Sequence, residues 1–247
     1  MDKKLFIISN KEYLSTRIDG FVSKQSKSAF QKNLNDIYIF DELMARRIAA
    51  SDFILIYAEN ISLEEEKKLE WIISKTKEIK TTIVYFVIND KGNPYFNTFK
   101  KNYHRHIDIF FYFDYMEHLK YTLLDLMINS FLHSIFKNND NSINVQDFKD
   151  IIYGNSEGNI IVSFEMGKDK IDKSIRSLKK NLISYGEDIP TSGIILIAIC
   201  DSSFAVEDAE DIIEDIKGVL PEDINLIFRF SSLSTLKDKL FISLYKL

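Results

Sequence analysis

The chain has 247 residues, of which 45% are hydrophobic and 28% are charged, and its formal net charge is -5. This length allows one large domain or two small ones, each able to bury a core, while the negative charge gives no electrostatic support for a nucleic-acid partner. Glycine is scarce, with 8 residues where an average usage of about 7% would supply roughly twice that number, and this disfavours glycine-rich phosphate loops.

Four apolar runs in the first half are typical of buried strands. They cover residues 5–9, 53–57, 82–88 and 107–113. After the second run, Ser62 and Glu65 have the spacing of a capping box, which predicts that a helix begins there and continues through Ile73. The order of strand, helix and strand favours a parallel sheet.

A long helix and a polar loop are expected next. Apolar residues keep helical spacing over most of residues 115–136. The polar stretch 137–142 that follows is typical of a loop. We expect the domain boundary there, with one domain over 1–114, the long helix and its loop over 115–141, and a second domain over 142–247.

The second half predicts a further α/β unit. Helices are expected at residues 147–152, 171–183 and 206–218, and strands at 159–164, 193–200, 224–230 and 240–245. The strand at 193–200 is a continuous apolar run, which is typical of burial on both faces. Gly218 is expected to stop the helix that precedes it.

The composition also predicts a cytoplasmic setting. Cys200 is the one cysteine, so it has no partner for an internal disulfide, and this favours a reducing compartment. The first apolar run is too short for a secretory signal, because Asn10 and Lys11 follow it. No window of the sequence approaches the roughly 20 apolar residues that cross a bilayer.

Motifs in the second half resemble the FtsZ family, the bacterial tubulin-like GTPases that polymerise into the division ring. After its long central helix this family has a loop of pattern N-x-D-x-x-D and then a short helix. Here the loop reads S-I-N-V-Q-D, so Asp147 is kept, while Ser142 and Asn144 replace the first two motif residues. The strands that read GIILI and KLFISL look like the family's G-V-L-V-N-I and R-V-T-V-I-A.

The resemblance implies an FtsZ/tubulin-like α/β fold. It has a parallel α/β N-terminal layer, a long central helix and a C-terminal mixed-sheet α/β domain. It also implies that the chain starts after the family's opening strand and glycine-rich loop, so that residues 1–114 form a truncated Rossmann-like domain. The family's linker and C-terminal peptide, which recruit membrane anchors, are expected to be absent.

The family's phosphate loop, A-G-M-G-G-G-T-G-T-G, falls on residues 58–67 without a gap, and every glycine is replaced. The positions of this degenerate loop include Asn60, Ser62, Glu64, Glu65 and Glu66. We expect the capping box to use N–H groups of the helix and the glutamates to satisfy its dipole. A triphosphate there would meet like charges, so GTP binding and GTPase activity are predicted to be lost, and no cofactor is expected.

Other candidate residues have two interpretations each. Asp125 looks like the central-helix aspartate that meets the guanine ring in the family, or it is an acid on the helix surface. Asp147 and Asp150 could act as an acid–base pair or face a neighbouring subunit, or Asp147 could cap the short helix. His104 and His106 lack a further ligand at metal-binding spacing, so no metal site is predicted, and Cys200 is expected to be a core residue.

Three functions follow as hypotheses. The first is a non-catalytic FtsZ/tubulin-like protein that acts through protein contacts and caps or regulates FtsZ filaments in cell division. Its docking loop would comprise Ser142, Asn144, Asp147 and Asp150. The second is a cytoskeletal protein that assembles with itself without nucleotide, and the third is a nucleotide-binding protein or enzyme with a remodelled pocket.

Overall fold

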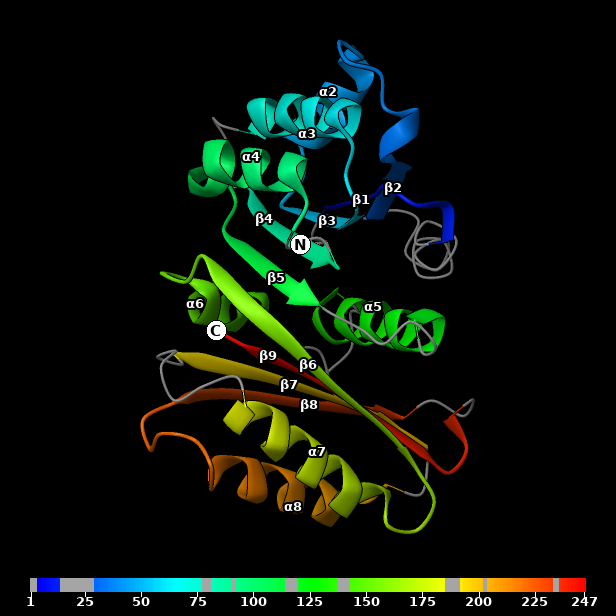
Figure 1. The fold of residues 1–247 in the computed structure, drawn as a ribbon, viewed down its shortest axis with the longest axis vertical. Coiled ribbons are helices and arrows are strands. Elements are labelled where there is room, and N and C mark those ends of the chain that lie inside the picture. The colour runs from blue at the N-terminus through cyan, green and yellow to red at the C-terminus, as the bar shows by residue number, and fades with distance from the viewer. Residues whose placement is uncertain are drawn as a thin grey trace. The chain divides into compact units, whose positions relative to one another are not determined.

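The computed structural model describes residues 4–13, 29–76, 81–89, 92–113, 120–136, 143–184, 192–201, 204–232 and 236–247. Contacts divide the chain into two compact units (Figure 1). The first comprises Met1–Tyr115 with Tyr153–Gly158, and the second comprises Met116–Ile152 with Asn159–Leu247. The loop predicted at 137–142 lies outside the described residues.

The first unit contains a parallel sheet. Its strands are β1 (Leu5–Ser9), β2 (Ala29–Asn33), β3 (Phe53–Glu59), β4 (Thr82–Ile88) and β5 (Ile109–Phe113). Their order across the sheet is β2-β1-β3-β4-β5, with every neighbouring pair parallel. The sequence predicted the bounds of β1 and β4 correctly. β3 continues two residues further than predicted, and β5 begins two residues later.

Helices cover one face of this sheet (Figure 1). They are η1 (Leu34–Asp36), α2 (Glu42–Ala49), α3 (Leu63–Thr76), α4 (Pro94–Tyr103) and η2 (His104–His106). The sequence predicted α3 but missed β2, α2 and α4. For α4 a local signal was present, because Asn93 caps the helix and Pro94 occupies its first turn.

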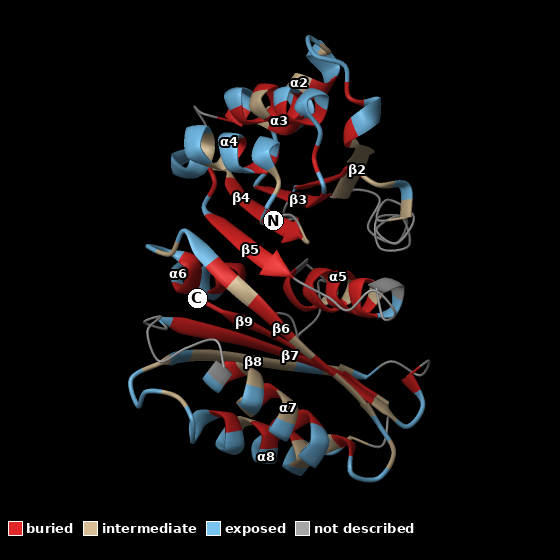
Figure 2. Cartoon of the chain, viewed as in Figure 1, coloured by how far each residue is buried: buried red, intermediate tan, exposed pale blue. Residues whose placement is uncertain are grey.

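Aromatic side chains fill both faces of the first sheet. On the helix-covered face, Tyr85 lies 5.7 Å from the ring of Phe96 and 5.5 Å from that of Phe110. On the opposite face, the rings of Tyr57 and Phe86 stack at 4.3 Å. β3 and β4 are buried at every position (Figure 2), as is typical of parallel strands that are covered on both sides.

The second unit combines helices with a mixed sheet. Its elements are α5 (Lys120–Phe136), α6 (Val145–Ile152), β6 (Glu157–Met166), α7 (Lys170–Ser184), β7 (Gly193–Cys200), α8 (Val206–Lys217), β8 (Asn225–Ser232) and β9 (Lys239–Lys246). β9 runs antiparallel between β6 and β7, and β8 pairs parallel with β7. α7 and α8 cover one face of this sheet, while α5 and α6 lie on the other (Figure 1).

Every element predicted for the second half is present. β7 has the predicted bounds, and α8 ends one residue before Gly218, which is its C-cap. The short helix begins at Val145 rather than at Asp147, so this predicted start was wrong. The start predicted for the long helix, at residue 115, lies outside the described residues.

α5 and α6 are fixed to the sheet of the second unit by apolar contacts. The ring of Phe131 lies 5.8 Å from that of Phe148 on α6 and 5.4 Å from that of Tyr245 on β9. A Cβ on Gly193 would lie 2.5 Å from Ile151, so the glycine allows α6 to approach β7 closely. Among the described helices, none combines the length and the hydropathy that a membrane span requires.

Replacing Phe131 by Ala should destabilise the second unit strongly. The side chain is fully buried, so its removal loses apolar burial and leaves a cavity, at a cost of about 3–5 kcal/mol. Urea unfolding followed by circular dichroism measures the change. Tyr153→Ala is the matched control, because Tyr153 is 89% exposed; equal effects of the two variants would contradict this account of the core.

Candidate functional site

The candidate site lies at the carboxyl ends of the strands in the first unit. In open α/β sheets, ligands bind there at the point where the strand order reverses. The chain goes outward from β1 to β2 and then crosses to β3 on the other side of β1, so the reversal lies between β1 and β3. The residues that follow these two strands, Asn10 and Asn60, therefore mark the site.

The strand order also bears on the predicted truncation. β1 lies between β2 and β3, so the chain continues from it first to one side and then to the other, and this is the place of the first strand in doubly wound sheets. The order therefore does not support the prediction that the chain starts after the opening strand of the fold. The residues after β1 read N-K-E-Y and include no glycine.

Asn10 closes the gap between the ends of β1 and β3. Its side-chain Nδ2 donates to the carbonyl of Glu59 at 2.8 Å, and its Oδ1 accepts from the N–H of Glu59 at 3.0 Å. Its backbone N–H donates to the carbonyl of Tyr57 at 3.3 Å. The amide, only 2% exposed, thus pairs with β3 as the backbone of a neighbouring strand would.

The carboxylate of Glu59 also lies at this edge. Although Glu59 is the last residue of β3, it is buried. The hydroxyl of Tyr13 donates a hydrogen bond to its Oε2. A carboxyl group bonded to Tyr13 therefore lies at the end of β3, beside the reversal point.

The connection between β3 and α3 is three residues long. Glu59 ends the strand and Leu63 begins the helix, so the positions aligned with the family's ten-residue phosphate loop are mostly strand or helix. Asn60 has a φ of 50°, a left-handed conformation that asparagine tolerates better than most residues. Ile61 is buried, and its carbonyl accepts from Nδ2 of Asn93 at 3.0 Å.

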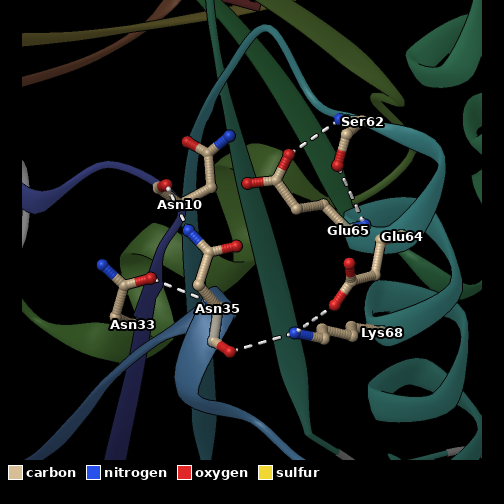
Figure 3. A network of polar contacts seen from close by, with 7 residues as sticks. All are labelled: Asn10, Asn33, Asn35, Ser62, Glu64, Glu65 and Lys68. Atoms are coloured by element: carbon tan, nitrogen blue, oxygen red, sulfur yellow. Dashed lines mark hydrogen bonds and ion pairs between the residues drawn. The ribbon is translucent and has the colours of Figure 1, made fainter.

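The predicted capping box is confirmed at the start of α3 (Figure 3). The N–H of Ser62 donates to Oε2 of Glu65 at 2.7 Å, and the N–H of Glu65 donates to Oγ of Ser62 at 3.3 Å. These two bonds satisfy donors that a helix N-terminus otherwise leaves open.

The other two glutamates have different surroundings. Glu64 is exposed and pairs with Lys68 at 3.0 Å, while Nζ of Lys68 also donates to the carbonyl of Asn35 at 3.0 Å. Glu66 is buried, and desolvation, followed by the nearby charge of Glu70, raises the pKa of its carboxyl group.

A chain of polar contacts joins the ends of β2 and β1 (Figure 3). Oδ1 of Asn33 accepts from the N–H of Asn35 at 2.9 Å, and Nδ2 of Asn35 donates to the carbonyl of Asn10 at 3.3 Å. Together with Lys68, these residues connect β2, β1 and α3. The sequence analysis missed Asn10, Asn35 and Lys68; the one local signal was an asparagine directly after the apolar run of β1.

The docking loop predicted in the second unit has a different cap from the expected one. Oδ1 of Asn144 accepts from the N–H of Gln146 at 2.9 Å, so Asn144 caps α6 and the prediction that Asp147 does so was wrong. Asp147 is exposed in the first turn of α6. Asp150 accepts from Nε2 of Gln146 at 2.7 Å, and Ser142 lies outside the described residues.

The remaining candidate residues are accounted for by local contacts. Oδ1 of Asp125, which is half-buried on α5, accepts from Nδ2 of Asn129 at 3.0 Å. His104 and His106 are exposed on η2, and no group of three or more His, Cys, Asp or Glu suited to a metal occurs in the described ranges. Cys200 is buried, as predicted, and burial raises the pKa of its thiol to about 12.

Comparison with known proteins identifies the fold. No protein-family model matches the chain, and no curated protein matches it. An FtsZ mutant from M. jannaschii matches with a TM-score of 0.77 at 10% identity, over 99% of this chain and 91% of that chain. The empty FtsZ dimer of M. jannaschii gives the same TM-score and identity, over 100% and 88% of the two chains.

A second group of solved structures is also similar. A CetZ protein from Haloferax volcanii, in a GTPγS-bound protofilament, matches with a TM-score of 0.61 at 8% identity, over 98% of this chain and 92% of that chain. The chain therefore has the FtsZ/tubulin-like α/β fold, as the sequence motifs predicted. At this level of identity the likeness concerns the fold.

Replacing Asn10 by Ala should destabilise the first unit. The substitution removes both bonds to Glu59 and leaves a buried N–H and a buried carbonyl without their partner, which costs on the order of 1–3 kcal/mol per group. Urea unfolding measures the loss. Asn102→Ala is the control, because Asn102 is exposed on α4; a loss no larger than that of the control would contradict the bridging role of Asn10.

Proposed function

We propose that this chain is a non-catalytic protein of the FtsZ/tubulin-like fold that does not bind GTP and acts through protein–protein contacts. The observation that carries the proposal is the closed connection between β3 and α3. Three residues join the strand to the helix, and the first turn of the helix is capped by Ser62 and Glu65.

The hydrogen bonds at this edge support the proposal. A phosphate site at a helix N-terminus needs backbone N–H groups that point at the anion and a backbone that can approach it closely. Here Ser62 and Glu65 use each other's N–H groups, and Ile61, within the connection, is buried. A phosphate would have to displace the capping contacts to reach these two N–H groups.

The charges support it as well. Glu59, Glu64 and Glu65 lie at or beside the connection, and Lys68 is engaged by Glu64 and Asn35. Two like charges 4 Å apart repel by about 1 kcal/mol in bulk water and about 4 kcal/mol near a protein surface. A triphosphate would meet several such repulsions at once.

A partner surface remains on α6. The helix is anchored by Val145, Phe148, Ile151 and Ile152, which are buried. Asp147 is exposed, and within the described ranges its carboxylate makes no hydrogen bond or ion pair. Since the similar structures include an FtsZ dimer and a CetZ protofilament, we assign α6 to contact with another subunit of this fold.

Two roles are open to such a protein. If α6 docks on an FtsZ filament while the β3–α3 edge accepts no nucleotide, the chain caps or regulates that filament in cell division. If α6 docks on a second copy of this chain, the protein assembles with itself without nucleotide. The exposed Asp147 supports both roles, and the partner distinguishes them.

Titration with GTP or GDP in the presence of magnesium should give no heat in calorimetry and no thermal shift. The reason is that the donors and space of the phosphate site are taken by protein groups, whereas a ligand at 100 times its Kd would add about 2.7 kcal/mol of stability. An FtsZ that binds GTP is the positive control. Micromolar binding would refute the proposal.

Asp147→Lys should abolish docking without unfolding the protein, because it reverses a charge on an exposed position of α6. Co-sedimentation with FtsZ filaments and light scattering of the pure protein measure the two roles. Glu222→Lys makes the same charge change at another exposed position and serves as the control. Docking that survives in the Asp147 variant would remove α6 from the interface. Asn144 is unsuited to this test, since it caps α6.

A further inference from the structure

A group of large apolar side chains is exposed at the start of α2. Tyr38 is 75% exposed, Phe40 85% and Leu43 62%, and Ile39 between them is 38% exposed. We call these four residues the α2 patch; the turn and helix that carry it are largely exposed (Figure 2). Contiguous apolar surface of this kind on a folded domain marks an interaction site.

The backbone of the turn that carries the patch is strained at Phe40. The N–H of Asp41 donates to the carbonyl of Tyr38 at 3.2 Å, which closes a turn with Phe40 at its third position. Phe40 has a φ of 78°, where glycine is the usual residue. A bulky side chain is strained in this region, and such strain clusters at functional sites.

Buried neighbours fix the turn on both sides. Ile37, directly before it, is fully buried, and Met44, in the first turn of α2, is also buried. Oδ1 of Asp41 accepts from the N–H of Met44 at 3.0 Å and caps α2. The exposure of Phe40 therefore belongs to an anchored turn that presents an aromatic ring to a partner.

The charges on α2 identify the partner. Glu42 lies in the first turn and Arg46 in the last, both are exposed, and their spacing of four places them on one stripe of the helix beside Leu43. If two copies of α2 pack antiparallel, Glu42 of each copy faces Arg46 of the other. The patch is thus complementary to itself.

We propose that the α2 patch is the interface of a twofold-symmetric dimer of this chain. Tyr38, Phe40 and Leu43 form its apolar centre, and a Glu42–Arg46 pair closes each end. Twofold dimers use the same patch on both subunits, and aromatic and arginine side chains are enriched at interfaces. A membrane surface fits less well, because Asp41 and Glu42 stand beside the apolar residues.

The area predicts a weak dimer. An aromatic side chain buries about 150–250 Å², so the four residues supply on the order of 500 Å² per subunit, below the roughly 800 Å² per partner of a standard interface. We expect a concentration-dependent equilibrium with a micromolar Kd. This interface lies wholly in the first unit and does not depend on the role proposed for Asp147.

Sedimentation velocity from nanomolar to high micromolar protein tests the proposal. Wild type should shift from monomer to dimer, and Leu43→Asp should stay monomeric, whereas Tyr153→Asp, a control at a position that is 89% exposed, should dimerise like wild type. Phe40→Gly should lose at least tenfold in dimer affinity while gaining stability toward urea, because it relieves the strain at φ 78°. If the turn had only a structural role, dimer affinity would not fall while stability toward urea rises.

Charge exchange gives a second, sharper test. Glu42→Arg and Arg46→Glu should each weaken the dimer, because like charges then face one another. The double variant E42R/R46E should restore it, and an equimolar mixture of the two single variants should form heterodimers. Wild type that stays monomeric throughout, or a dimer indifferent to these changes, would overturn the proposal. Pelleting with anionic lipid vesicles by a monomeric wild type, lost in Leu43→Asp, would also overturn it and assign the patch to membranes.

Discussion

The structure of the first unit depends on how the ends of its parallel strands are satisfied. Parallel strands leave polar backbone groups and helix N-termini together at one edge, and these groups must be bonded by the protein or by a ligand. Here Asn10 pairs with the backbone of Glu59, and Glu65 pairs with Ser62. These backbone groups at the edge are thereby bonded from within the chain.

This closure links stability to the proposed function. The N–H of Glu65 in the first turn of α3 is bonded to Ser62, so a contact that stabilises α3 also occupies a donor of the kind that a phosphate uses. Lys68 illustrates the point, because a cation that could attract a phosphate is instead held by Glu64 and the carbonyl of Asn35.

The two proposed interaction surfaces differ from this edge, because their outward residues are exposed. At α6 and at the α2 patch, buried residues anchor the element, while Asp147 and the large apolar side chains of the patch are exposed. Phe40 is both exposed and strained, and Asp147 is a charge on a helix whose inner face is apolar. At the edge of the first sheet the polar groups contact one another, whereas the exposed residues of these two surfaces can contact another molecule.

The sequence by itself determined the elements with strong local signals. Apolar runs gave β1, β4 and β7, and the spacing of Ser62 and Glu65 gave the start of α3, because these depend on residues close together in the chain. Tertiary structure alone decided that Asn10 pairs with a strand 49 residues away. It likewise decided the positions of α2 and of the edge strand β2, because such short segments are stabilised mainly by packing against distant parts of the chain.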